Sequence, residues 1–395
     1  MIIIGIDIGK NKHEATLIDE SGNIIGKSIK FENSTDGFNK LISKINSYNI
    51  SNDELIFTME ATGHYWLSLF SKLVESNYNV QVINPIQTNA CRKFYIRETK
   101  NDSKDSFLIA QVTRFNGFTK TTLPDETMIS LKELTRFRTF LVDDISDYKR
   151  KAIVVLDKIF PEYTQMFSDI FGKTSKKILT KYPLPKDILN EDLESLSKVL
   201  SSSSKGRFSY AKAEQLQSLA KNSFGIKFAS EPLSMEIRSI ISTIEHLENQ
   251  VSDLDDKIAV LLKSLDTTIE TIPGIGPILG AIIVSEIGDI NRFSHASKLV
   301  AYAGIDPTVK QSGEFTGTKN RMSKRGAPYL RRALWTAAVV AAFNDPDLHE
   351  YYLKKKAEGK HHGTVIGAIA RKLIYRIFVV LRDNVPYQCN KCEAS

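Results

Sequence analysis

The first 120 residues alternate apolar runs with segments of helical spacing, and this order constrains the fold more than any other feature. An apolar run at 2–8, and two more at 14–19 and 24–31 joined by a Ser-Gly-Asn turn, predict a strand and a hairpin. The remaining signals predict helices at 35–48, 64–75 and 102–116 and strands at 55–59 and 80–84. A strand meander followed by βα units predicts an α/β domain, a mixed sheet with helices on its faces.

Beyond this region the strand signal fades, and the chain is predicted to be mostly α-helical. A 4-3-4-3-4 spacing of apolar residues predicts a coiled-coil seam, with one helix of a bundle as the alternative; the seam is Leu247, Val251, Leu254, Ile258, Leu261 and Leu265. The SSSSKG stretch at 201–206 reads as a flexible joint. We expect an α/β domain at 1–122, a helical or coiled-coil linker at 123–268 and a mostly α-helical third domain at 269–385.

Composition narrows the class of protein only mildly. The chain has 395 residues and a formal net charge of +7, which favours an anionic partner without establishing one. Its three cysteines indicate no disulfide framework, and the terminal Cys389-x-x-Cys392 pair supports a zinc site only weakly. The apolar stretch 271–285 is too short to span a bilayer, so no membrane association and a cytoplasmic location are expected.

Four acidic residues stand where such a sheet would bring them together: Asp7, Glu60, Asp102 and Asp105. Asp7 and Glu60 lie at or near the ends of predicted strands. Asp102 and Asp105 are three residues apart at the start of a predicted helix, which places them on one helix face. Clustered carboxylates repel one another unless a cation neutralises them, and oxygen-only ligands suit Mg²⁺ or Mn²⁺ in phosphodiester chemistry. Each acid has an ordinary alternative, as a turn former, a helix-dipole partner or an N-cap.

The acids lie in motifs that resemble those of a known family, the DEDD transposases of bacterial insertion sequences. The motifs are GIDIGKNKH, MEATGHYW, KNDSKDS, IPGIGP, QSGEFTG and SKRGAPYLRRAL. The resemblance implies a RuvC-like domain of the RNase H fold, in which Asp7, Glu60, Asp102 and Asp105 bind Mg²⁺ at the scissile phosphate. It also implies that Ser312, in the Ser-Gly motif, attacks DNA and forms a 5′-phosphoserine. Implied partners are donor and target double-stranded DNA, a guide or bridge RNA, and further copies of the chain, from dimer to tetramer, associated with the nucleoid.

Two further segments are candidates for nucleic-acid binding. IPGIGP resembles half of a helix-hairpin-helix, in which Gly274 and Gly276 would free backbone N–H groups for a phosphate; a tight interhelical turn is the alternative. A basic strip would contact DNA phosphates, with a solvated basic face as the alternative; it comprises Lys319, Arg321, Lys324, Arg325, Arg331 and Arg332. A hairpin turn remains the alternative for the segment around Ser312.

Three other functions remain open at this point. GIDIGKNKH also resembles the phosphate loop of actin-like ATPases and sugar kinases, but the second phosphate loop and the adenosine loop of that superfamily are missing from the sequence. A RuvC-like nuclease of the Holliday-junction resolvase type would use water and leave Ser312 idle. A transposase descendant that only binds nucleic acid is disfavoured because all four acids and Ser312 are present.

Overall fold

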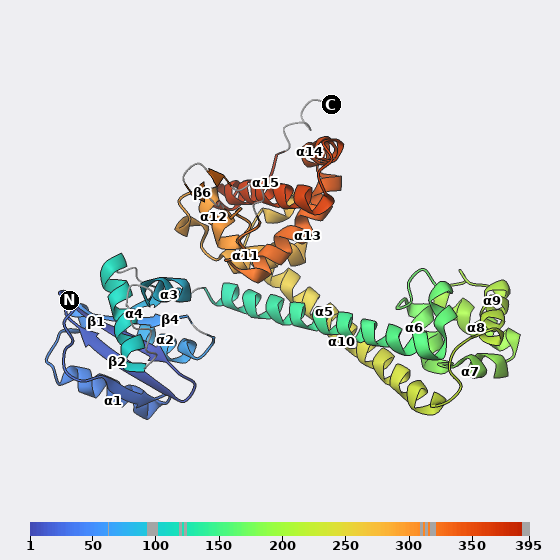
Figure 1. Ribbon diagram of the computed structural model, residues 1–395, viewed down its shortest axis with the longest axis horizontal. Coiled ribbons are helices and arrows are strands. Elements are labelled where there is room, and N and C mark those ends of the chain that lie inside the picture. The colour runs from blue at the N-terminus through green and yellow to red at the C-terminus, as the bar shows by residue number, and fades with distance from the viewer. Residues whose placement is uncertain are drawn as a thin grey trace. The chain divides into compact units, whose positions relative to one another are not determined.

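The computed structural model describes residues 1–61, 63–92, 102–117, 121, 125–308, 311–312, 315–316 and 321–388. It forms two compact units, Met1–Pro124 and Asp125–Ser395, both drawn in Figure 1. The three-domain division expected from the sequence stays a prediction.

The first unit is built on a five-stranded mixed sheet of order β3-β2-β1-β4-β5. Its strands are β1 (Ile2–Ile8), β2 (Lys12–Ile18), β3 (Ile29–Glu32), β4 (Leu55–Glu60) and β5 (Asn79–Ile83). The pairs β1–β2 and β2–β3 are antiparallel, whereas β1–β4 and β4–β5 are parallel. The predicted mixed sheet is therefore confirmed.

One strand is shorter than the sequence suggested. The apolar run at 24–31 was expected to be a continuous strand, but β3 begins only at Ile29 and Ile24 makes an isolated bridge to Ile18. Gly26 has a φ of +72°, which lies outside the extended region and interrupts the strand.

Helices cover both faces of this sheet. They are α1 (Thr35–Asn46), α2 (Trp66–Glu75), α3 (Pro85–Arg92) and α4 (Asp102–Asn116). Helices α1, α2 and α4 were predicted, whereas α3 was not. Apolar side chains of α1 and α2 pack with one set of strand residues that includes Ile4 and Phe57. Ala110 of α4 packs with Ile3 and Ile18 on the opposite face, so the unit has three layers (Figure 1).

Helix α4 lies very close to the centre of the sheet. A Cβ atom added to Gly5 of β1 would lie 2.1 Å from the Ser106 carbonyl oxygen and 2.5 Å from the Ala110 nitrogen. Only glycine leaves room for a helix backbone at this distance, because any side chain would overlap it. Gly5 therefore fixes how closely α4, with its two acidic residues, approaches β1.

The second unit contains two long helices, α5 (Glu126–Ile159) and α10 (Ser230–Ser264). They run antiparallel: Arg138 pairs with Asp255, and the Lys149 Nζ lies 3.1 Å from Glu248 Oε1. The predicted seam on α10 packs against α5 of the same chain, where Leu141 and Leu254 belong to one buried cluster. The seam thus packs against a helix of the same chain, and the choice between a coiled coil and one helix of a bundle stays a prediction.

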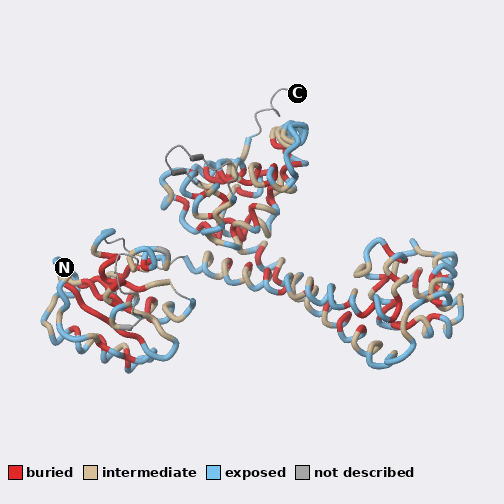
Figure 2. The backbone as a smooth tube through the Cα atoms, in the orientation of Figure 1, coloured by how far each residue is buried: buried red, intermediate tan, exposed pale blue. Residues whose placement is uncertain are grey.

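The segment between these helices folds as a small helical region, and the mostly helical character predicted for the rest of the chain is confirmed. Its elements are α6 (Lys173–Lys181), α7 (Pro185–Asn190), α8 (Leu193–Ser204), α9 (Tyr210–Lys221) and the one-turn 3₁₀ helix Pro161–Gln165. They share a core with the adjoining ends of α5 and α10, separate from the cluster at the other ends (Figure 2). The expected flexible joint is wrong for its first four residues: Ser201–Ser204 form the last turn of α8, where the Ser203 hydroxyl donates to the Val199 carbonyl.

In its described residues, the remainder of the second unit is mostly helical and includes one antiparallel pair of two-residue strands. Its elements are α11 (Pro277–Ile287), α12 (Ala296–Ala303), α13 (Pro328–Asn344), α14 (Pro346–Ala357), α15 (His362–Asp383), β6 (Gln311–Ser312), β7 (Phe315–Thr316), and 3₁₀ turns at Ile269–Thr271 and Ile290–Arg292. Alanines at 333, 337, 338 and 341 of α13 are buried and let neighbouring helices approach closely. Among the helices of the described ranges, none combines the length and apolarity that crossing a membrane requires.

Candidate active site

Asp7 and Glu60 occupy matching positions on neighbouring strands. Asp7 is the next-to-last residue of β1, and Glu60 ends β4. The strands are parallel, and their register pairs Gly5 with Thr58. Two residues further along each strand come Asp7 and Glu60, so the register brings their backbones side by side at one edge of the sheet.

Both side chains leave the sheet on the face that α4 covers. Gly5 faces α4, as its close approach shows, and the Thr58 hydroxyl lies 2.7 Å from the Thr113 hydroxyl of α4 in a buried hydrogen bond. Side chains alternate along a strand, so residues two apart share a face. Asp7 therefore points to the same face as Gly5, and Glu60 to the same face as Thr58.

Helix α4 crosses the strands with its acidic first turn directed to this edge. The Ser106 hydroxyl lies 2.7 Å from the Thr16 hydroxyl of β2, while Thr113 bonds to β4. Ile109 and Val112 pack with Ile83, which pairs with Glu60 at the same edge. Asp105 shares a helix face with Ile109 and Val112, since residues three and four apart are neighbours on a helix.

Helix α3 contacts two of the acids with two residues on one of its faces. The Thr88 hydroxyl donates to Glu60 Oε2 at 2.5 Å, and Thr88 is only 1% exposed. Four residues later, the Arg92 guanidinium donates to Asp105 Oδ1 at 2.8 Å. The sequence analysis missed both residues, because nothing in their spacing connects them with the acids. An Arg ion pair shows that the Asp105 carboxylate already has a cation as its partner.

The chemistry of the four acids suits a hard divalent cation, since carboxylate oxygens are the ligands that Mg²⁺ prefers. Among the side chains that the structure describes, no three His, Cys, Asp or Glu residues converge closely enough to hold a metal ion. That search covers Asp7, Glu60 and Asp105, while the side chain of Asp102 lies outside the described residues. The metal site thus stays a prediction. Two of its four proposed ligands, Asp102 and Asp105, belong to helix α4.

The segment around Ser312 has a hairpin backbone. Ser312 pairs with Phe315 across β6 and β7, as the alternative interpretation expected. The side chain of Ser312 lies outside the described residues, as do Lys319, Cys389 and Cys392. A hairpin is compatible with either role of the serine, because a tight turn can present a hydroxyl or merely connect two strands.

The two glycines of IPGIGP have different surroundings. Gly274 has a φ of +90°, and an added Cβ would lie 2.7 Å from the Ala337 carbonyl oxygen of α13. Gly276 is the N-cap of α11, and an added Cβ there would meet no atom within 4 Å. Packing explains Gly274, whereas Gly276 lies in open space at a helix N-terminus, where a phosphate could approach.

The predicted basic strip divides into two groups. Arg332 forms a bidentate pair with Asp143 of α5 at 2.7 Å, which lowers the pKa of Asp143 and raises that of Arg332. Arg331 donates to the Ala303 carbonyl oxygen. The exposed residues Arg321, Lys324 and Arg325 make no ion pair with any described carboxylate. These three are the cations of the strip that the structure leaves open to an anionic ligand.

Two family models match most of the chain's recognisable motifs. A transposase model of the DEDD, IS110 type matches residues 4–161, which include the four acids. A model described as transposase, IS116/IS110/IS902 family, matches residues 266–353, which include Ser312 and the basic strip.

Full-length relatives agree with these matches. An insertion element IS116 protein of 44.8 kDa from Streptomyces clavuligerus is 26% identical, covering 97% of this chain and 95% of its own length. A pilin gene-inverting protein of Moraxella bovis is 24% identical over 97% of both chains. The mini-circle putative transposase for IS117 of Streptomyces coelicolor is 22% identical, covering 91% of this chain and 89% of its own. The chain belongs to the IS110/IS116/IS902 family of insertion-element transposases and is a DNA transposase, an enzyme of DNA recombination.

Proposed function

We propose that the chain cuts and rejoins DNA with an RNase H-like domain that binds Mg²⁺ and with Ser312 as the nucleophile. The metal ligands would be Asp7, Glu60, Asp102 and Asp105, and Mn²⁺ would substitute for Mg²⁺. The observation that carries this proposal is the matched placement of Asp7 and Glu60 at one sheet edge, with the acidic first turn of α4 directed to the same edge.

The proposed chemistry conserves the energy of the phosphodiester bond. The Ser312 oxygen forms a bond to phosphorus, the bond from phosphorus to the 3′ oxygen breaks, and the serine proton leaves as the 3′ oxygen gains one. The product is a 5′-phosphoserine and a free 3′ hydroxyl. A 3′ hydroxyl of a second strand then attacks the phosphoserine, which forms the new DNA joint and restores the serine.

The acids would serve this chemistry by holding the cation at the scissile phosphate. When bound, Mg²⁺ would stabilise negative charge on the phosphate and lower the pKa of the attacking hydroxyl. Thr88 would orient Glu60 through its hydrogen bond, and Arg92 would neutralise Asp105 before the cation binds. A serine hydroxyl is a poor nucleophile at its ordinary pKa, so some such activation is required.

The DNA partners would be donor and target duplexes, bound in the cytoplasm at the nucleoid. Arg321, Lys324 and Arg325 supply unpaired positive charge for their phosphates. A guide RNA would choose the sites by base pairing, and two to four copies of the chain would combine the acids of one copy with the serine of another. The resemblance of the motifs supports these last two points.

A covalent trapping assay tests the nucleophile. The full-length protein is incubated with guide RNA, Mg²⁺ and end-labelled donor and target DNA, then denatured and searched for protein–DNA adducts. Ser312→Ala is run beside Ser294→Ala, a matched control at an exposed serine of the same unit. We expect the adduct with wild type and Ser294→Ala and none with Ser312→Ala. Cleavage without an adduct, unchanged in Ser312→Ala, would instead establish a RuvC-like nuclease that uses water.

A further inference from the structure

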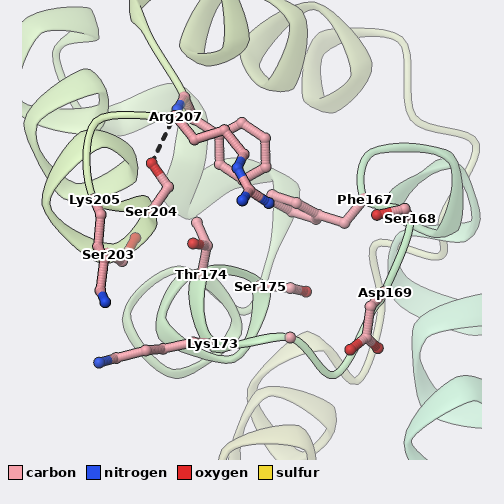
Figure 3. Close-up of a pocket in the computed structure, with 12 residues that line it drawn as sticks. Phe167, Ser168, Asp169, Lys173, Thr174, Ser175, Ser203, Ser204, Lys205 and Arg207 are labelled. Carbon is pink, nitrogen blue, oxygen red and sulfur yellow. Dashed lines mark hydrogen bonds between the residues drawn. The ribbon is translucent and has the colours of Figure 1, made fainter.

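A pocket of about 290 Å³ lies in the small helical region between α5 and α10, for which the proposed function has no role. It is formed where the start of α6 meets the end of α8 and the turn that follows (Figure 3). The pocket belongs entirely to the second unit and is far along the chain from the proposed catalytic residues.

The charge that lines this pocket is predominantly positive. Lys173, Lys205 and Arg207 line it, and all three side chains are exposed. None of them forms an ion pair with a carboxylate in the described part of the chain. Asp169 is the acidic residue of the lining, and its Oδ1 accepts the Phe171 N–H at 2.9 Å. Three cations and one carboxylate give the pocket lining a net positive charge, which favours an anionic ligand.

A hydroxyl that forms no hydrogen bond with any described residue also lines the pocket. Thr174 is only 7% exposed, yet its hydroxyl has no hydrogen bond within the described residues. Figure 3 shows this hydroxyl directed into the pocket, between Ser203 and Ser175. A hydroxyl that the protein leaves without a partner in a pocket wall is available to donate a hydrogen bond to a bound anion.

The start of α6 adds donors at the same place. Thr174 is in the first turn of this helix, and no side chain caps it, since the N-cap residue is Gly172. The first N–H groups of a helix have no partner within the helix, and the helix dipole places partial positive charge there. Together with Thr174 and the three cations, this arrangement favours a phosphate group.

The opposite wall is fixed before any ligand arrives. Lys205 has a left-handed backbone with a φ of +55° and ends α8. The Ser204 hydroxyl accepts the Phe208 N–H at 2.9 Å (dashed line in Figure 3), which holds the turn that carries Lys205 and Arg207. A wall held by its own hydrogen bonds loses little conformational entropy when it binds a ligand.

We propose that this pocket binds a backbone phosphate of a nucleic-acid strand carried by the transposase. The proposal rests on the proposed function in one respect, that the enzyme acts while holding nucleic acid. Lys173, Lys205 and Arg207 neutralise the phosphate, and the Thr174 hydroxyl and the first N–H groups of α6 donate hydrogen bonds to its oxygens. The pocket thereby anchors the strand at the end of the α5–α10 helix pair.

Strand binding by the full-length protein tests this proposal. The probes are a labelled single-stranded RNA and a single-stranded DNA of the same sequence, titrated at several salt concentrations. The pocket variant is Lys173→Gln/Arg207→Gln, and its charge-matched control is Lys186→Gln/Lys221→Gln, two exposed lysines of α7 and α9 outside the pocket. Thermal unfolding verifies that both variants fold. Lys205→Asn, which tolerates the left-handed backbone, is the second variant if the first does not fold.

We expect the pocket variant to bind RNA, DNA or both several-fold more weakly, and the control to bind like wild type. For a single strand, losing one phosphate contact lowers the slope of log affinity against log salt by about 0.7. The strand that responds identifies the natural ligand as RNA or DNA. Equal slopes and affinities for the pocket variant and the control would overturn the proposal.

Inorganic phosphate distinguishes a strand site from a small-anion site. Phosphate that stabilises wild type but not the pocket variant against heat, with strand binding unchanged in both, would overturn the assignment to a strand. The same measurements are made with Ser312→Ala. If the pocket substitutions still weaken strand binding in the Ser312→Ala protein, which forms no adduct, the pocket proposal holds whether or not Ser312 is the nucleophile.

Discussion

The Arg92 guanidinium lies 2.8 Å from the Asp105 carboxylate, joining the last residue of α3 to the first turn of α4. The side chains of both residues are less than one-third exposed. If Asp105 binds Mg²⁺, Arg92 and the metal ion compete for the same negative charge. The pair therefore connects the metal affinity of the site with the position of α3.

Replacing Arg92 by Gln should strengthen Mg²⁺ binding. Removing a partly exposed ion pair changes the free energy by about 0.5–1 kcal/mol, so the Mg²⁺ concentration for half-maximal thermal stabilisation should fall about two- to five-fold. Arg114→Gln is the control, since Arg114 bonds to Gln111 on the same helix. An unchanged Mg²⁺ midpoint in Arg92→Gln would contradict the competition.

Neutralising a single acid should abolish DNA cleavage and leave DNA binding nearly intact. Asp7→Asn, Glu60→Gln, Asp102→Asn and Asp105→Asn each remove a proposed ligand with little change in shape, and we expect losses of about 100-fold or more in rate. Asp36→Asn is the control, because Asp36 lies in the first turn of α1, on the opposite face of the sheet. Cleavage by Asp102→Asn at the native rate would refute the metal site.

The two glycines of IPGIGP should respond differently to alanine. Gly274→Ala would place a methyl group 2.7 Å from a backbone oxygen of α13 at a φ of +90°, and should lower the free energy of unfolding by about 2–4 kcal/mol. Gly276→Ala has open space around it and should change stability by less than about 1 kcal/mol. Denaturant unfolding of both variants measures the difference, and equal losses would contradict the packing role of Gly274.

The free energy of unfolding should decrease at acidic pH because Glu248 of α10 becomes protonated. Burial raises the pKa of Glu248, but hydrogen bonds from Lys176 and Lys149 outweigh it, so the folded-state pKa lies below the ordinary value of 4.5. The unfolded chain therefore takes up a proton first as the pH falls. The stabilisation is fully present above pH 4.5 and is lost as the pH falls through the folded-state pKa.

Glu248→Gln should accordingly flatten the pH dependence of unfolding below this value. Glu245→Gln, at an exposed position one turn earlier, is the control and should keep the slope of wild type. Identical slopes for Glu248→Gln and wild type would show that the two lysines do not hold the carboxylate in solution.

The sequence by itself determined the elements and the candidate residues. Period-two and helical spacing are local properties, so the strands around Asp7 and Glu60 and the helix that begins at Asp102 could be predicted within a few residues. The four acids could be named as candidates because they lie in motifs that resemble those of the family, and the cation that they would share stays a prediction. The interruption of β3 at Gly26 was missed, since its apolar neighbours carry the same pattern as a strand.

Only the tertiary structure decided which groups meet. The Arg92–Asp105 pair, the partner of the α10 seam and the cations around Thr174 join residues on different elements, and no local spacing encodes such distances. The seam is an example: its heptads are the same whether the partner is a second chain or α5, and the antiparallel packing of α5 decides it. Likewise SSSSKG is polar enough for a linker, but the hydroxyls bond back to helix carbonyls and make it the wall of a pocket.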